Sequence, residues 1–303
     1  MTIEMIPFAE GEAKMRWQGL LAAFEAGHTR AKAEIGDTFL YRGEDTLLSR
    51  AAWIDGMGSL VKTANIFPGN PGAGKPMVNG AVNLYSDTDG TLEAIVDFHL
   101  VTKWKTAGDS LYAASKLARK DARKFLIVGA GTVGRSMIEA YGALFEGTEF
   151  TVWNRSPKGA EEMAADIPGL TVAEDLEAAV GEADVIATAT MASTPVIKGA
   201  WLKPGQHLDL IGAYRPDMRE VDDEAISRAR VFVNSYDTTV AHIGEIIEPL
   251  KSGALKRDEI VADYYEPEQF RRTSDEEITI AKNGGGAHLD LMTSRYILEA
   301  WRG

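Results

Sequence analysis

The feature that most constrains this chain is an alternation of short apolar runs with helix-like segments in its second half. The apolar runs are rich in β-branched residues and lie at 124–128, 149–153, 183–189, 206–212 and 230–234. The helix-like segments between them lie at 134–146, 158–166, 174–181 and 222–229. Strands that alternate with helices form a parallel sheet covered on both faces, which explains why these strands are apolar throughout. The pattern predicts an α/β fold with a Rossmann-type parallel sheet.

A glycine-rich turn follows the first of these strands and opens the helix after it. It reads Gly129, Ala130, Gly131, Thr132, Val133 and Gly134, which fits the pattern G-x-G-x-x-G. The first glycine permits a tight turn, the second lets the backbone approach a pyrophosphate, and the third allows close packing of helix on strand. The free N–H groups at the helix start then face the phosphates. In this strand–turn–helix context the motif predicts a bound dinucleotide rather than a simple tight turn.

The residues after the second strand indicate which dinucleotide binds. A site for NAD usually has Asp or Glu there, because a carboxylate accepts a hydrogen bond from the ribose 2′-OH. This chain instead has Asn154, Arg155 and Ser156, with Lys158 nearby. A guanidinium can pair with a 2′-phosphate and stack on adenine, while Asn and Ser can donate hydrogen bonds. The sequence therefore predicts NADPH in preference to NADH.

The loops after two later strands supply the other cofactor candidates. Thr190 and Met191 follow the run at 183–189, and Gly212 ends the run at 206–212. Ligands of open parallel sheets bind outside the carboxyl ends of the strands, so these residues are expected to contact the cofactor. The net charge of −13 repels anionic ligands. A phosphate must therefore be held by local positive groups.

The first 110 residues differ and predict a second, mixed α/β domain for substrate binding and dimerisation. Helices are expected at 9–26 and 99–119, and short strands at 38–41, 46–53, 59–67, 77–85 and 91–98. The segment 68–76 is too rich in Pro and Gly to continue a strand. A final amphipathic helix over 286–301 is expected to return to this domain. The predicted domains are 1–113 with 287–303, and 114–286 for the Rossmann-type domain.

The composition limits which binding partners and which cellular compartment are expected for this chain. The acidic balance argues against a nucleic-acid surface, which needs a basic face. No stretch approaches the roughly 18–20 apolar residues that span a bilayer. The N-terminus carries acids and no apolar secretory segment, so a cytoplasmic location is expected. The chain has no cysteine, and its five histidines show no metal-ligand spacing, so no metal site is predicted.

Five segments together resemble the ornithine cyclodeaminase/μ-crystallin family. They read "LVKTANIFPGNPGAGKPMV", "LVTKWKTAGDSLYAASKLAR" running into "FLIVGAGTVG", "VWNRS", "LIGAYRPDMREVDDEAI" and "ITIAKNGGGAHLDLM". The resemblance covers almost the whole chain. It implies a homodimer built through the first domain, a nicotinamide cofactor, and a small α-amino or α-imino acid as substrate.

The matched positions favour one reaction of the family over others. In the cyclodeaminases, the resemblance implies a Lys at the position of Lys62 near the substrate, an Arg that clamps the carboxylate, and a catalytic Asp. Here Lys105 replaces that Arg and Tyr214 replaces that Asp. These differences count against ornithine cyclodeamination. The chain is more similar to the μ-crystallin branch, which resembles NADPH-dependent ketimine reductases.

The expected reaction is hydride transfer from NADPH to the C=N carbon of Δ1-pyrroline-2-carboxylate or Δ1-piperideine-2-carboxylate. This would place the chain in amino-acid metabolism, including that of proline. Lys62, Lys105 and Arg50 are the candidate catalytic cations, because they would hold the carboxylate and depress a lysine pKa enough for proton transfer. Two alternatives stay open. One is an ornithine cyclodeaminase or alanine-type amino-acid dehydrogenase, and the other is an NADPH-bound small-molecule-binding protein of μ-crystallin type.

Overall fold

The computed structural model describes residues 3–303, and the chain divides into two compact units. Unit 1 contains Met1–Lys105 and Gly286–Gly303, and unit 2 contains Thr106–Gly285. Unit 1 has a six-stranded sheet and unit 2 a seven-stranded sheet. All strand pairs described in unit 2 are parallel, which confirms the predicted α/β fold with a Rossmann-type sheet.

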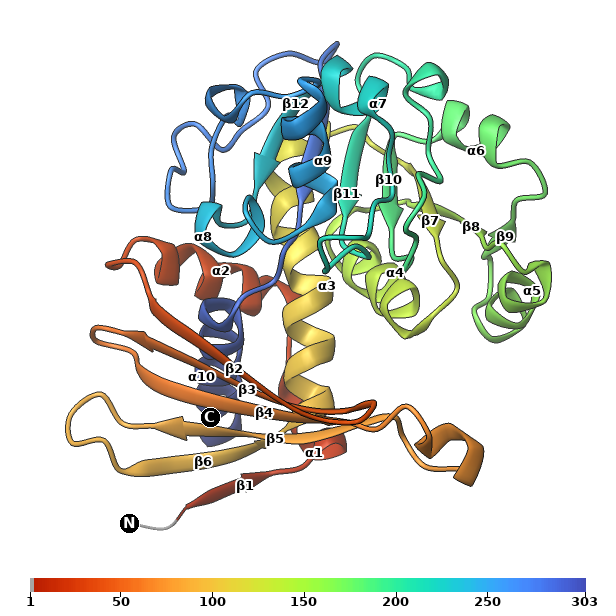
Figure 1. Ribbon diagram of the computed structural model, residues 1–303. Coiled ribbons are helices and arrows are strands. Elements are labelled where there is room, and N and C mark those ends of the chain that lie inside the picture. The colour runs from red at the N-terminus through yellow and green to blue at the C-terminus, as the bar shows by residue number, and fades with distance from the viewer. Residues whose placement is uncertain (1–2) are drawn as a thin grey trace. The chain divides into compact units, whose positions relative to one another are not determined.

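Unit 1 is built on a sheet with the order β1-β6-β5-β4-β3-β2, in which β1 pairs in parallel and the other neighbours are antiparallel. Its strands are β1 (Glu4–Ile6), β2 (Glu34–Arg42), β3 (Asp45–Ile54), β4 (Gly58–Ile66), β5 (Val78–Tyr85) and β6 (Leu92–Asp97). Its helical elements are α1 (Phe8–Lys14), α2 (Trp17–His28), the first part of α3 (Phe98–Leu117), α10 (Ala287–Arg302) and the 3-10 turn η1 (Asn70–Ala73). Helix α10 lies against β3, β4 and β5, as Figure 1 shows.

The helix predicted over 9–26 is wrong as a single element. The structure has two helices, α1 and α2, separated by extended backbone at Met15 and Arg16. The break buries the side chains of Met15 and Trp17. Tyr296 satisfies the freed backbone: its hydroxyl accepts from the N–H of Arg16 and donates to the carbonyl of Arg16, both at 3.1 Å. Tertiary packing therefore overrides local helix propensity here.

Unit 2 contains a sheet with the order β12-β13-β11-β10-β7-β8-β9. Its strands are β7 (Lys124–Val128), β8 (Glu149–Trp153), β9 (Thr171–Val172), β10 (Val185–Thr188), β11 (His207–Leu210), β12 (Ala229–Val233) and β13 (Ile278–Lys282). Besides the end of α3, its helical elements are α4 (Thr132–Leu144), α5 (Pro157–Asp166), α6 (Leu176–Glu182), α7 (Asp223–Arg228), α8 (Tyr236–Thr239), α9 (Gly244–Ser252), η2 (Gly199–Trp201) and η3 (Arg257–Glu259). Strands β7 and β8 match the prediction to the residue, whereas β13, between β11 and β12, was not predicted.

Side chains on β7 show how the two faces of the parallel sheet are covered. Phe125 packs against Tyr141 of α4, with 5.1 Å between the ring centroids. Leu126 belongs instead to a buried cluster with Val180 of α6. Because successive strand residues point to opposite faces, α4 and α6 lie on opposite sides of the sheet (Figure 1). The loops that follow β7, β8, β10 and β11 start at one edge, because these strands are parallel.

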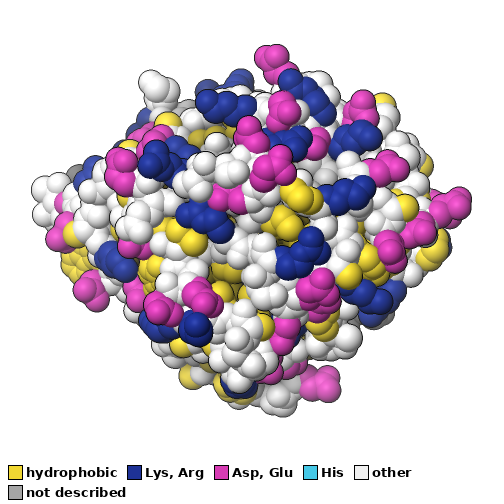
Figure 2. All heavy atoms as spheres, turned by 90° about the horizontal axis from the view of Figure 1, so that it is seen from above, with side chains coloured by type: hydrophobic (Ala, Val, Ile, Leu, Met, Phe, Trp, Pro, Cys, Tyr) yellow, Lys and Arg dark blue, Asp and Glu magenta, His cyan; other side chains and the backbone are white. Residues whose placement is uncertain are grey.

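The surface carries both signs of charge. On the face shown in Figure 2, Lys and Arg side chains lie among Asp and Glu side chains. That face therefore does not present the continuous basic stripe that a nucleic-acid backbone requires. Within residues 3–303, no helix combines the length and apolar character needed to cross a membrane.

Candidate functional site

Lys62 lies on β4 beneath α10 and is 8% exposed. Its Nζ donates to Asp290 Oδ1 at 2.8 Å and to Thr102 Oγ1 at 2.9 Å. The same atom lies 4.7 Å from the centroid of the Phe98 ring, whose face stabilises a cation. An ammonium group has three N–H donors, and these two acceptors are its hydrogen-bond partners within residues 3–303. One donor is therefore left for another acceptor.

The surroundings of Lys62 make its proton easier to release. Burial lowers the pKa of Lys62 from 10.5 to about 8, and the positive charges of Lys105 and Arg50 act in the same direction. The charge of Asp290 opposes them and raises the pKa. A lysine in this environment is protonated at neutral pH yet is a much stronger acid than a surface lysine. It is therefore suited to donate a proton to a substrate.

Asp290 on α10 is the buried partner of Lys62, and it was not predicted as a site residue from the sequence. Burial alone would raise the pKa of Asp290, but the charges of Lys62, Lys105 and Arg50 hold it below its usual value. Asp290 therefore remains a carboxylate, and its Oδ2 is buried with no hydrogen-bond partner in the described part of the chain. The available signal was an acid in "AHLDLM", on the buried face of an amphipathic helix.

Arg50 and Lys105 complete a cationic cluster around this pair. Arg50 lies opposite Lys62 on the neighbouring strand β3. Its guanidinium binds both oxygens of Asp37 on β2, with Nε–Oδ1 at 3.0 Å and Nη2–Oδ2 at 2.7 Å. Lys105 on α3 is half-buried and makes no hydrogen bond or ion pair with residues 3–303. The structure brings the three predicted cations together in unit 1, and Lys105 keeps an uncommitted ammonium.

The glycine-rich turn joins β7 to α4 in unit 2. Gly129 has φ of 121°, in the region that favours glycine, and a Cβ on Gly134 would clash with the carbonyl oxygen of Gly129. A Cβ on Gly131 would meet no atom within 4 Å, so the space beside it is open. Helix α4 begins at Thr132, and no side chain caps its first N–H groups, which include that of Val133. The turn therefore has the shape and the free amides that a pyrophosphate requires.

Asn154 connects the glycine-rich turn to the loop after β8. Its Oδ1 accepts from the N–H of Ala130 at 3.1 Å, and its Nδ2 donates to the carbonyl of Ser156 at 2.9 Å. Arg155 is exposed and forms no ion pair with the described residues. The hydroxyl of Ser156 does not cap α5, and Lys158 forms an ion pair within that helix at 3.7 Å. Asn154 therefore shapes the turn, while Arg155 and Ser156 keep side chains that a ligand could use.

Thr190 and Gly212 lie in the loops after β10 and β11, and both bond to one buried carboxylate. Glu220 Oε1 accepts from the N–H of Thr190 at 2.8 Å and from its hydroxyl at 2.7 Å. Glu220 Oε2 accepts from the N–H of Gly212 at 2.8 Å and from that of Ala213 at 3.2 Å. Met191 is 73% exposed in the same region. Thr190 and Gly212 were predicted at this edge of the sheet from the sequence, whereas Glu220 was not predicted.

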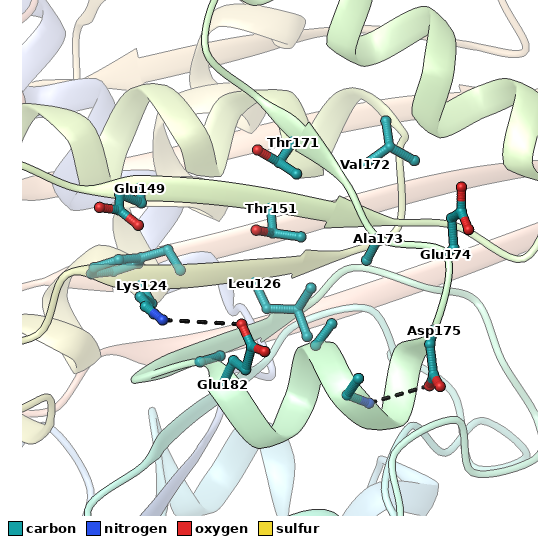
Figure 3. Close-up of a pocket in the computed structure, with 14 residues that line it drawn as sticks. Lys124, Leu126, Glu149, Thr151, Thr171, Val172, Ala173, Glu174, Asp175 and Glu182 are labelled. Carbon is teal, nitrogen blue, oxygen red and sulfur yellow. Dashed lines mark hydrogen bonds and ion pairs between the residues drawn. The ribbon is translucent and has the colours of Figure 1, made fainter.

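A cavity of about 310 Å³ lies over β7, β8 and β9 beside α6 (Figure 3). Carboxylates line it: Glu149, Glu174, Asp175 and Glu182. Lys124 is the one lysine among the lining residues, and its Nζ lies 4.0 Å from Glu182 Oε2. Because carboxylates repel phosphate, this cavity is not the candidate cofactor site. Among residues 3–303, no group of three or more His, Asp or Glu side chains is arranged to hold a metal ion.

A Rossmann-type sheet with an open glycine-rich turn, together with a unit that buries a lysine–aspartate pair, defines an α/β protein of the dinucleotide-binding class. A sequence profile of the ornithine cyclodeaminase/mu-crystallin family matches residues 54–303. The chain is 46% identical to the Delta(1)-pyrroline-2-carboxylate reductase of Paracoccus denitrificans, over 99% of this chain and 98% of that protein. It is 32% identical to the ketimine reductase mu-crystallin of Mus musculus, over 79% and 75%. This protein belongs to the ornithine cyclodeaminase/mu-crystallin family, as the resemblance implied.

Two solved structures share this fold. An archaeal alanine dehydrogenase dimer with bound NAD superposes with a TM-score of 0.89 at 27% identity, over 99% of this chain and 96% of that one. The Delta(1)-pyrroline-2-carboxylate reductase of Thermococcus litoralis, in complex with NADH and L-proline, gives a TM-score of 0.90 at 24% identity, over 98% and 97%. The second likeness supports the fold alone.

Proposed function

We propose that this protein uses NADPH to reduce the C=N bond of a cyclic imino acid, either Δ1-pyrroline-2-carboxylate or Δ1-piperideine-2-carboxylate. The observation that carries the proposal is the 46% identity to the Paracoccus reductase over 99% of the chain. The buried pair of Lys62 and Asp290 supports it, because reduction of a C=N bond requires a proton donor for the nitrogen.

Unit 1 supplies the groups that act on the imino acid. Lys105, whose ammonium is uncommitted, binds the substrate carboxylate, and Arg50 adds positive charge while Asp37 holds it in place. The free donor of Lys62 gives its proton to the ring nitrogen, so an N–H bond breaks on Lys62 and one forms on the product amine. Asp290 fixes the position of the Lys62 ammonium. When bound, the cofactor supplies the hydride for the carbon of the C=N bond.

Unit 2 supplies the groups that hold the cofactor. The amides of Thr132 and Val133 at the start of α4 bind the pyrophosphate, beside the open space at Gly131. Arg155 and Ser156 bind the 2′-phosphate, which is the reason for proposing NADPH over NADH. Four further residues fix the loops around the cofactor without binding it directly: Asn154, Ala130, Thr190 and Gly212. Gly129 and Gly134 allow the tight turn. Lys158 lies at the start of α5, and Met191 lies in the loop after β10.

We also propose that the protein is a homodimer formed through unit 1. Strand β2 is an edge strand whose residues are all exposed, and its apolar side chains include Leu40 at 59% and Tyr41 at 74% exposure. An open apolar edge strand is a template for pairing with another chain. Light scattering should give twice the chain mass of 32.9 kDa, and a Leu40→Lys/Tyr41→Lys double variant should halve it. Glu44→Lys in the following turn is the control, and a monomeric wild type would refute the dimer.

The reaction is tested by following NADPH absorbance with a panel of substrates. We expect NADPH to be consumed with one or both cyclic imino acids, and the cyclic amino acid to accumulate in equal amount. Oxidation of NADPH only with pyruvate plus ammonia would replace the proposal with an alanine-type dehydrogenase. Release of ammonia from ornithine would replace it with a cyclodeaminase. Cofactor binding without turnover on the whole panel would leave a binding protein.

A further inference from the structure

Glu220 is a fully buried carboxylate whose side-chain oxygens are saturated by the chain itself. Each oxygen accepts two hydrogen bonds, one oxygen from Thr190 and the other from Gly212 and Ala213. Thr190 follows β10, and the other two donors follow β11, which is the neighbouring strand. The carboxylate therefore joins two loops that leave the same edge of the sheet.

Gly212 shows how closely the two loops are held. A Cβ at this position would clash with the carbonyl oxygen of Thr190 and with Oε1 of Glu220. Any side chain at position 212 would therefore separate the loops. The glycine permits the close approach, and the carboxylate of Glu220 holds it.

A second buried carboxylate fixes Glu220 in turn. Glu245 at the start of α9 accepts from the N–H of Glu220 at 2.7 Å and from that of Val221 at 3.0 Å. Burial, and then the charge of Glu220, raises the pKa of Glu245 to about 7. The buried Lys282 at the end of β13 attracts both carboxylates. Two acidic side chains and one lysine are thus buried behind the two loops, and backbone N–H groups of the chain bond to both acids.

The sheet order tells which part of a dinucleotide these loops would serve. The glycine-rich turn follows β7, with β8 on one side of it and β10 and β11 on the other. A dinucleotide lies across this edge, with its pyrophosphate at the turn. Arg155 follows β8, on the adenosine side. The loops held by Glu220 lie on the opposite side of the turn.

We propose that Glu220 is a positioning residue for the nicotinamide half of the cofactor: it locks the loops after β10 and β11 into one surface against which that half is placed. The inference rests on the proposed function, because it requires a dinucleotide in unit 2. It adds a residue that acts through Thr190 and Gly212 and that touches no ligand itself.

The test compares the whole cofactor with its adenosine half in Glu220→Gln. This substitution keeps the shape but turns an NH₂ group toward backbone N–H donors, so one loop loses its acceptor. Affinity for NADPH should fall at least about tenfold, while affinity for adenosine 2′,5′-bisphosphate should stay within about twofold. Glu224→Gln, an exposed acid on α7, is the matched control and should change neither. Equal losses for both ligands, or unchanged NADPH affinity, would overturn the proposal.

A milder variant covers the case in which Glu220→Gln does not fold. Thr190→Val removes the hydroxyl donor alone, and it should weaken NADPH about threefold and leave the bisphosphate unchanged; no change in NADPH affinity would overturn the proposal. If the wild type prefers NADH, then NADH and ADP replace this pair of ligands. A wild type that binds the cofactor but reduces no imino acid refutes the proposed function alone. A wild type that binds neither dinucleotide overturns both.

Discussion

The two units bury charge in opposite ways. In unit 1, Lys62 has two partners for three donors, and Asp290 Oδ2 has no partner in the described chain. In unit 2, both oxygens of Glu220 are filled by loop donors. A buried polar group with an unfilled hydrogen-bonding position is costly unless a ligand fills it, whereas a saturated one gives a rigid structure. This difference supports the proposal that unit 1 carries out the proton chemistry and that unit 2 positions the cofactor.

The largest effect is expected from Lys62→Met, which removes the proton donor and keeps an unbranched side chain. Turnover of the imino acid should fall about 10²- to 10⁴-fold. NADPH affinity should not change, because the groups proposed to bind the cofactor lie in unit 2. Steady-state kinetics and a fluorescence titration measure the two quantities. Near-wild-type turnover would exclude Lys62 as the proton donor and would refute the proposed division of roles between the two units.

The same substitution separates chemistry from stability. Lys62→Met leaves Asp290 buried without its cation, so the free energy of unfolding should fall by about 3–5 kcal/mol in urea. The double variant Lys62→Met/Asp290→Asn removes the uncompensated charge and should recover most of that loss without recovering turnover. Lys75→Met in the exposed segment at η1 is the control for both measurements.

Arg155→Ala probes the other unit and should be the next largest effect. Losing a guanidinium–phosphate contact should weaken NADPH about 10- to 100-fold. Affinity for NADH and the KM for the imino acid should stay the same, since neither involves the 2′-phosphate. Arg271→Ala, an exposed arginine of unit 2, is the matched control. Equal losses for NADPH and NADH would refute the role of Arg155.

Lys105→Ala should act on the imino acid alone and by a smaller factor. In the proposed mechanism Lys105 offers a point charge to the substrate carboxylate, so its loss should raise the KM for the imino acid about tenfold. Lys105→Arg keeps the charge and should restore most of the affinity. A change in NADPH affinity of similar size in Lys105→Ala would contradict the division of labour between the units.

The sequence predicts this fold best where burial imposes a continuous pattern. Strand β7 is buried from Phe125 to Val128, so it appears as an apolar run, and its limits, like those of β8, were predicted to the residue. Strand β13 has a similar run, but it follows a long irregular stretch after α9 and pairs with strands far earlier in the chain. The interruption of the helix at Met15 depends on Tyr296, which a local pattern does not reveal.

The residues of the candidate site also differ in whether the sequence could predict them. Lys62, Lys105 and Arg50 could be selected because they fall in segments that resemble the family. Asp290 lies 228 positions from Lys62, and no periodicity connects them. Glu220 stands in a polar segment where an exposed acid is the ordinary expectation. The fold determines which residues pair with a buried charge. The sequence alone therefore predicted the cation Lys62 but not its partner Asp290.

Asp290→Asn gives the smallest but most specific effect, because it changes the pH dependence of turnover. A proton donor must be protonated, so wild-type kcat at saturating NADPH should be level at lower pH and fall as the pH rises through about 8, the pKa of Lys62. The negative charge of Asp290 raises that pKa, so its removal should move the falling limb to lower pH. Asp55→Asn, in the turn after β3, should leave the limb in place. If the limb stays at the wild-type pH in Asp290→Asn, then Asp290 does not tune the pKa of Lys62, and its charge has a structural role only.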